Sequence, residues 1–180
     1  FIGGIIMKRL RKILALLLSV SMMGVFSGCG KSSDSSSSGE KVLKVGMECA
    51  YAPFNWTQTD DSNGAVKIAG SEEYANGYDV MMAKKIADKI GYKVEINKME
   101  WDGLCPGVSS GKIDVSIAGQ SITAERLQSV DFSDVYYKAD IVALTRKGTA
   151  YENAKNVNDL KGAVCTSQLN TVWYDLLDQI

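Results

Sequence analysis

The stretch "KIDVSIAGQSITAERLQSVDFSDVYY", residues 112–137, carries the pattern that decides the fold. Isoleucine and valine alternate with polar residues over positions 113–117, which predicts a β-strand. Thr123 then has the side chain of a helix N-cap, which would place Arg126 in the first helical turn. The positive end of a helix dipole disfavours a cation there, so this arginine requires a negatively charged partner.

The segments around this stretch continue an alternation of strands and helices. Alternating apolar residues predict strands over residues 41–47 and 92–99, and helical patterns occupy residues 78–91 and 102–111. Residues 57–77 are polar and turn-rich, which predicts a small hairpin with "SNG" at its tip. Such alternation is typical of a parallel α/β sheet, where ligands bind beyond the carboxyl ends of the strands. The stretches "ECAY", "EWDG" and "AGQSITAER" follow strand ends, so we expect them to meet in space.

The predicted helix over residues 78–91 has recognisable ends and an apolar face. Asp79 is expected to cap its N-terminus, and Gly91 to end it in the left-handed conformation. In the next helix, Asp102 is the expected N-cap. The apolar face of the first helix is predicted to face the core and consists of Met82, Ala83, Ile86, Ala87 and Ile90.

The pattern of strands and helices begins again after residue 139. It predicts strands over residues 140–148 and 163–168, a short helix over residues 157–162 and another helix from residue 170 onward. About forty residues cannot bury a full core of their own, so we expect this second unit to be incomplete in this chain. The alternative is one small domain with a C-terminal extension.

The N-terminal residues predict an export signal followed by a tether. Residues 1–6 precede the first methionine and are interpreted as an upstream extension. Residues 7–28 join the basic cluster "MKRLRK" to an apolar run of fourteen residues, shorter than the ~20 that a spanning helix needs. The run ends in "FSGC", which resembles the bacterial lipobox and implies acylation of Cys29; an ordinary secretory signal with a chance cysteine is the alternative. The Ser-rich residues 29–41 are then a flexible, lipidated tether.

Composition excludes several classes of function. The chain has 20 basic and 21 acidic residues, a balance that gives no support for nucleic-acid binding. It has no histidine, which excludes Ser-His-Asp catalysis, Cys-His catalysis and histidine metal ligands within this sequence. The spacing of Cys49, Cys105 and Cys165 fits no metal motif. We expect no metal and no cofactor, and we expect these cysteines to be small buried side chains that form at most one disulfide.

Chemistry alone leaves two partners open for Arg126. The free amides at the start of a helix, together with the glycine and hydroxyl groups of residues 119–123, make an anion site, and arginine adds a planar fork that fits a carboxylate. A bound carboxylate would then offset the unfavourable dipole. Alternatively, the side chain turns back to a surface acid such as Glu125 or Asp131.

Four stretches together resemble a known family: "LKVGMECAYAPFNW", "GYDVMMAKKIADKIG", "DGLCPGVSSGKIDVSIAGQSITAERLQSVDFSDVYY" and "DLKGAVCTSQLNT". In order and spacing they are similar to the extracytoplasmic solute-binding proteins of polar amino-acid ABC importers, grouped as family 3. The resemblance implies a two-lobed, periplasmic-binding-protein-like (type II) α/β fold, with a parallel sheet and flanking helices in each lobe. We place lobe 1 at residues 42–138, the truncated start of lobe 2 at residues 139–180 and the hinge near residues 136–140.

The resemblance also implies roles for residues of the first lobe. In that family the arginine of the "T-x-x-R" turn, here Arg126, clamps the α-carboxylate of the ligand. The preceding backbone and hydroxyl donors correspond to Gly119 and Ser121. The acidic residue at the end of the first strand, here Glu48, takes the α-amino or side-chain group of the ligand, although a solvated strand-end acid is the alternative.

Aromatic and second-lobe residues complete the implied site. The ring of the "Y-x-P-F" block, Tyr51, and the ring before "D-G-L", Trp101, are expected to sandwich the ligand; packing in the core is the alternative for both. In the second lobe, Gln168 and Thr171 match the family pattern "Q-x-G-T". Asn170 replaces its glycine, a change that the turn tolerates because asparagine adopts positive φ more readily than most residues.

The resemblance implies binding and transport, with no chemistry on the ligand. The expected protein is a monomeric lipoprotein outside the membrane, anchored through Cys29, that captures a polar L-amino acid by hinge closure. It would deliver this ligand to a membrane permease with its ATPase. The alternatives are a dehydratase-like enzyme of the same fold, a ligand-sensing domain and an adhesive surface lipoprotein. Among these, an enzyme would need a catalytic acid in the pocket, and Glu48 has no evident partner for that role.

Overall fold

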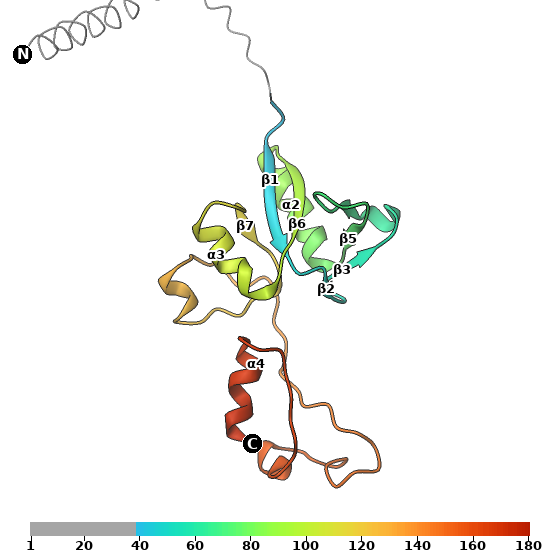
Figure 1. Cartoon of the computed structure of the whole chain (residues 1–180), viewed down its shortest axis with the longest axis vertical. Helices are drawn as coiled ribbons and strands as arrows, with labels where there is room; N and C mark the ends of the chain where they lie inside the picture. Colours follow the sequence, from blue (N-terminus) through green and yellow to red (C-terminus); the bar gives the residue numbers. More distant parts are fainter. Residues whose placement is uncertain (1–38) are drawn as a thin grey trace, which may run out of the picture. The chain divides into compact units, whose positions relative to one another are not determined.

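A parallel sheet of three strands forms the centre of the fold (Figure 1). The structure is a computed structural model, and it describes residues 39–180. β1 (Val42–Met47) lies between β6 (Lys93–Lys98) and β7 (Val115–Ser116) and pairs with both in parallel. The predicted parallel sheet is therefore confirmed. Its third strand, β7, is shorter than the apolar alternation over residues 113–117 suggested.

The polar excursion after β1 forms a second, antiparallel sheet. Its strands lie in the order β2 (Ala50–Tyr51), β3 (Asn55–Gln58), β5 (Tyr74–Asn76) and β4 (Val66–Lys67). The single-turn helix η1 (Ser62–Gly64) lies between β3 and β4. The predicted excursion is present, but "SNG" is not the tip of a hairpin, because the flanking strands β3 and β4 each pair with β5 and not with each other.

Helix α2 (Tyr78–Ile90) ends as predicted but begins differently. Gly91 adopts a left-handed conformation with φ of 73° and closes the helix. The prediction that Asp79 is the N-cap is wrong, because Gly77 occupies that position and Asp79 lies in the first turn. The carboxylate of Asp79 is fully buried and makes hydrogen bonds to other segments, so it turns away from the amides of its own helix.

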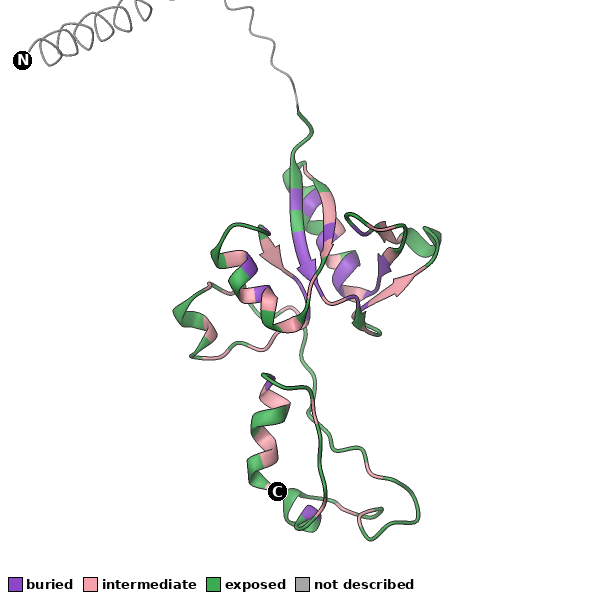
Figure 2. Cartoon of the chain, viewed as in Figure 1, coloured by how far each residue is buried: buried purple, intermediate pink, exposed green. Residues whose placement is uncertain are grey.

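The buried stripe of α2 is narrower than the apolar pattern suggested. Val80, Ala83 and Ala87 are buried, whereas Ile86 and Ile90 are 41% and 50% exposed (Figure 2). The prediction that these two isoleucines face the core is therefore wrong. The small side chains at positions 83 and 87 form the contact with the core, which leaves the isoleucines on the flank of that stripe.

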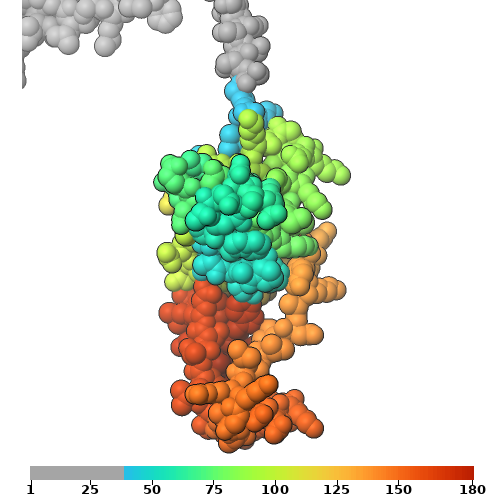
Figure 3. Space-filling view, turned by 90° about the vertical axis from the view of Figure 1, so that its right-hand side faces the viewer, coloured from blue at the N-terminus to red at the C-terminus, as the bar shows by residue number. Residues whose placement is uncertain are grey.

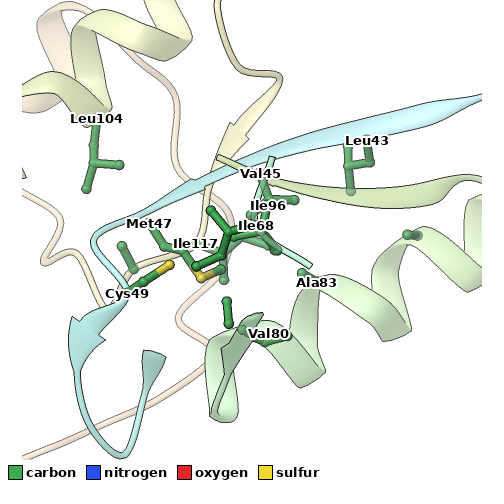
Figure 4. Packing of buried hydrophobic residues seen from close by; sticks show 13 residues of the cluster. Leu43, Val45, Met47, Cys49, Ile68, Val80, Ala83, Ile96, Leu104 and Ile117 are labelled. Atoms are coloured by element: carbon green, nitrogen blue, oxygen red, sulfur yellow. The ribbon is translucent and has the colours of Figure 1, made fainter. Parts of the chain in front are cut away.

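The core is formed between α2 and the parallel sheet (Figure 4). Gly46 in β1 packs closely against the core, since a Cβ atom there would overlap the end of the buried Ile113 side chain and force it to shift. The main buried side chains come from β1, β6, α2, α3, the segment after β4 and the segment after β7. They are Val45, Met47, Ile68, Val80, Ala83, Ile96, Leu104 and Ile117.

Short helical turns follow the strand ends. η2 (Trp101–Gly103) runs directly into α3 (Leu104–Ser109), so Asp102 lies inside η2 and Gly103 takes the predicted capping position of α3. After β7 comes η3 (Arg126–Gln128). The helix expected after Thr123 is thus a single turn, although the hydroxyl of Thr123 accepts a hydrogen bond from the Arg126 amide at 3.2 Å, as a cap does.

Residues 139–180 contain three short helices, η4 (Val157–Leu160), α4 (Val172–Asp175) and η5 (Leu176–Gln179). The predicted helices are therefore present, but in this described segment the two predicted strands, residues 140–148 and 163–168, are not formed. A strand needs a neighbour for its backbone groups and its apolar side chains. Without one, Val142 and Leu144 are 82% and 100% exposed.

Several expectations concern residues or boundaries that the structure does not test. The upstream extension, the signal segment and Cys29 lie outside the described residues, as does most of the tether. The lobe boundaries and the hinge at residues 136–140 stay predictions. In the part of the chain that is described, no helix has the length and apolar character needed to cross a membrane. Cys49 is buried as expected, Cys105 is half-buried, and Cys165 is exposed, contrary to expectation.

Candidate functional site

The exit from β1 is held in an uncommon backbone conformation. Cys49 has φ of 56°, and its amide donates to the Asn55 side chain at 2.8 Å. Positive φ is rare outside glycine, and here the buried asparagine stabilises it. The bend leads the chain from Glu48 to Tyr51. Burial raises the pKa of the Cys49 thiol to about 11, so this cysteine stays protonated and does not act as a nucleophile.

Arg126 binds two backbone carbonyl oxygens rather than a neighbouring acid. Its Nη1 donates to the carbonyl of Ser121 at 2.8 Å, and its Nη2 donates to the carbonyl of Asn170 at 3.0 Å. Among the described residues, Arg126 forms no ion pair with Glu125 or Asp131, so the structure does not support that alternative.

The dipole argument for Arg126 does not hold in this structure. η3 has three residues, and a turn that short has little macrodipole either to bind an anion or to repel a cation. The guanidinium lies 5.2 Å from the centroid of the Trp101 ring, which stabilises its charge. Arg126 is therefore positioned by carbonyl oxygens and an aromatic face.

The Gly119 loop turns its amide inward. Gly119 has φ of 62°, and its N–H donates to the hydroxyl of Tyr136 at 3.0 Å. This amide was expected to bind a ligand, but in this structure it is engaged within the protein. The role of Gly119 and Ser121 toward a ligand stays a prediction.

Two separate aromatic groups border these residues. Tyr51 stacks on Phe54 with ring centroids 5.1 Å apart, and Trp173 lies 5.9 Å from Tyr51 at a tilt of 46°. Trp101 instead lies against Arg126. Tyr51 and Trp101 are half-buried, and Trp101 packs against the core cluster. Contact of either ring with a ligand stays a prediction. The sequence analysis did not predict a role for Trp173. Its position two residues after the "QLNT" motif could have indicated one.

The turn of residues 168–171 contacts three of the predicted site residues of the first lobe, Glu48, Trp101 and Arg126. The carbonyl of Asn170 accepts from the Trp101 indole at 2.9 Å as well as from Arg126. The side-chain amide of Gln168 donates to the Glu48 carboxylate at 2.8 Å. In the space-filling view, the red C-terminal residues abut the blue and teal N-terminal half (Figure 3). Residues 120 positions apart in the sequence thus share one site.

The backbone of this turn follows the expectation for asparagine. Asn170 has φ of 59°, and its side-chain amide donates to the Asp102 carboxylate at 2.9 Å. Thr171 is the N-cap of α4 and accepts from the Tyr174 amide at 3.2 Å, while its hydroxyl donates to the Gln168 carbonyl at 2.6 Å. The Thr171 hydroxyl therefore stabilises the turn, and direct contact with a ligand stays a prediction.

Comparison with known proteins gives the relationship. Residues 43–179 match the family described as bacterial extracellular solute-binding proteins, family 3. The chain belongs to this family. Membership confirms the resemblance proposed from the sequence and the α/β fold class, to which the central parallel sheet conforms. The ligand-binding roles of Glu48, Arg126 and the 168–171 turn stay predictions.

Curated relatives are named for amino acids. The chain is 32% identical over 163 residues to the arginine-binding extracellular protein ArtP of Bacillus subtilis (strain 168), covering 91% of the chain and 58% of ArtP. It is 30% identical over 156 residues to the L-arginine-binding protein of Pseudomonas aeruginosa, covering 87% and 51%. The chain thus spans about half to three fifths of the length of these relatives.

A solved structure is also similar to part of the chain. An ancestral cationic amino acid solute-binding protein is 36% identical, with a TM-score of 0.49, over 66% of this chain and 46% of that one. The family relationship rests on the sequence matches over residues 43–179.

Proposed function

We propose that this protein binds a polar L-amino acid between Arg126 and Glu48. One observation carries the proposal: the 168–170 turn offers a carbonyl oxygen to Arg126 and Trp101, and an amide N–H to Glu48. An amino acid would supply the same pair of groups, with its carboxylate as the acceptor and its ammonium as the donor. The chain's own turn therefore matches the polar pattern of the proposed ligand.

The ligand enters by replacing these internal contacts. Its carboxylate would take the place of the Asn170 carbonyl on Nη2 of Arg126, while Nη1 keeps its bond to Ser121. A carboxylate binds a guanidinium more strongly than a neutral carbonyl does, which favours the exchange. Tyr51 and Trp173 would lie against the apolar part of the ligand. The names of the relatives direct the first tests to arginine, histidine and cystine.

The transport role is proposed for the whole protein. We propose that it acts outside the cell membrane as a monomer, is anchored through lipidated Cys29, and passes its ligand to an ABC permease and ATPase. Family membership and the names of the relatives support this role, and the basic and apolar N-terminal sequence supports the anchor. Closure about residues 136–140 would bring the 168–171 turn onto the ligand.

A thermal-shift screen tests the binding proposal. Each of the standard amino acids and cystine is added to the protein at millimolar concentration, and a ligand present at 100 times its Kd stabilises the fold by about 2.7 kcal/mol. We expect one polar amino acid to raise the melting temperature in the wild type and in Lys85→Ala, whose exposed ammonium lies on α2 and does not line the cavity beside Tyr51 and Gly119. The shift should be lost in Arg126→Ala. An absence of shift with every amino acid would contradict the proposal.

A further inference from the structure

The hydroxyl of Tyr136 connects parts of the chain that are far apart in sequence. It donates to Oδ1 of Asp79 at 2.9 Å and accepts from the Gly119 amide at 3.0 Å. The other oxygen of Asp79 accepts from the Asn55 side chain at 2.8 Å. Asn55 in turn accepts from the amide of Cys49 at 2.8 Å. One continuous set of hydrogen bonds thus runs from the end of β1 to the loop after β7.

A buried carboxylate is at the centre of this set. Asp79 is 0% exposed and Asn55 is 1% exposed. Burial raises the pKa of Asp79, while the hydrogen bonds from Asn55 and Tyr136 act in the opposite direction. No lysine or arginine pairs with Asp79 within the described residues, so these two donors satisfy the carboxylate. Removing either donor leaves a buried acceptor unpaired, which is costly.

The network reaches the proposed site on both sides. Cys49 follows Glu48 directly, and its positive φ sets the direction of the chain there. Gly119 lies two residues before Ser121, whose carbonyl positions Arg126. Both turns have left-handed backbone conformations; glycine adopts this readily, whereas Cys49 needs support from outside the turn. The same buried carboxylate supports both through one intermediate side chain each.

Tyr136 also lies at the start of the predicted hinge. Its ring stacks on Tyr78 with centroids 6.2 Å apart and an interplanar angle of 15°. The hydroxyl of Tyr78 donates to the Tyr136 carbonyl at 3.3 Å. Ring, backbone and hydroxyl are therefore all held by the first half of the chain. A movement of the backbone beyond residue 136 would act on the Gly119 loop through this side chain.

We infer that Tyr136, held by Asp79, is a positioning residue that keeps the Gly119 loop and the end of β1 in ligand-binding geometry and links them to the hinge. The inference rests on the proposed amino-acid site. Tyr136 itself touches no ligand. It acts through the Gly119 amide, which lies in the same loop as the Ser121 carbonyl that binds Arg126.

The first test needs no ligand. Tyr136→Phe removes the hydroxyl and keeps the ring stack, and hydrogen exchange of the Gly119 amide is followed by NMR. We expect exchange to accelerate at least about tenfold, since the amide loses its acceptor. Tyr137→Phe is the matched control, because that ring packs on Phe54 and Tyr78 without a hydroxyl in the network. Unchanged exchange at Gly119 in Tyr136→Phe would overturn the inference.

The second test measures affinity for the amino acid that stabilises the wild type. A positioning role predicts about tenfold weaker binding in Tyr136→Phe and little change in Tyr137→Phe. A lower melting temperature with unchanged affinity would assign Tyr136 a purely structural role and refute the inference. If no amino acid binds the wild type, the proposed function fails and the ligand-dependent part fails with it, while the exchange result still decides whether Tyr136 holds Gly119.

A second variant, Asp79→Asn, tests the same network in case Tyr136→Phe does not fold. Asp79→Asn keeps the size of the side chain but offers one acceptor oxygen in place of two. Either Tyr136 or Asn55 then loses its partner. We expect faster exchange at the Gly119 amide or at the Cys49 amide. Wild-type exchange at both amides would contradict the network.

Discussion

Replacing Arg126 with lysine keeps the positive charge and removes the fork. In the structure, Nη1 binds the Ser121 carbonyl and Nη2 binds the Asn170 carbonyl, so two nitrogens serve two directions at once. A lysine ammonium is a single point of charge on a flexible stem, and it cannot hold the Ser121 carbonyl and a ligand carboxylate in the same geometry. We expect Arg126→Lys to bind the amino acid more weakly.

The magnitude follows from the lost contact. One hydrogen bond between charged groups contributes about 1.5–3 kcal/mol, and stacking on Trp101 contributes about 0.5–1 kcal/mol, part of which lysine retains. Taking the hydrogen bond alone, Kd should rise by roughly 10- to 150-fold. The fold should be little affected, because Arg126 is half-buried and outside the core.

Isothermal titration calorimetry measures this difference with the amino acid that gives the largest thermal shift. The control is Lys85→Arg, which exchanges lysine and arginine at an exposed position of α2 that does not line the cavity beside Tyr51 and Gly119; its Kd should stay within about twofold of wild type. If the Kd of Arg126→Lys is within about threefold of the wild-type value, Arg126 does not hold the Ser121 carbonyl and the ligand carboxylate at the same time. The carboxylate then binds elsewhere.

Four further outcomes are expected. Glu48→Gln removes the negative charge that meets the Gln168 amide, and calorimetry should show weaker amino-acid binding at an unchanged melting temperature; unchanged affinity would remove Glu48 from the site. Asn170→Ala removes a side-chain hydrogen bond and places alanine at φ of 59°. Urea unfolding should show a free energy of unfolding that is about 1–2 kcal/mol lower than in the wild type. A higher free energy of unfolding would contradict this account of the turn. Burial raises the pKa of Asp79 above its ordinary value of 3.8, so the folded state binds the carboxyl proton more tightly than the unfolded state does. The stability that Asp79 contributes should therefore fall as the pH rises through the window above 3.8. Unfolding curves of Asp79→Asn should lack this pH dependence. Iodoacetamide at pH 8 should label exposed Cys165 and spare buried Cys49 in mass spectra, and equal labelling would contradict the burial of the β1 exit.

The elements that the sequence predicted well are those with complete local signals. β1 and β6 have apolar residues at alternate positions, and α2 has an apolar period that ends at Gly91. The predicted strands over residues 140–148 and 163–168 contain short apolar runs, yet neither strand forms in the described structure. Apolar alternation records a preference, and a strand also needs a partner to pair its backbone.

The site was predictable to the extent that it follows strand ends. Glu48, Trp101 and Arg126 come after β1, β6 and β7, and the rule that ligands bind beyond the carboxyl ends of parallel strands brought them together. The contacts of Arg126 were not predictable. Its partners are main-chain carbonyls, and any residue type at positions 121 and 170 would supply them. No side-chain pattern records such a partner.

The sequence by itself determined the parallel α/β class, the order of the elements and the polar residues at the strand ends, because periodicity and capping are properties of neighbouring residues. Only the tertiary structure decided the role of Asp79. From the sequence it was a helix cap, and in the fold it is a buried carboxylate that joins Asn55 to Tyr136. A charged group enters the core only where distant segments supply its hydrogen bonds, and those segments meet only after the chain has folded.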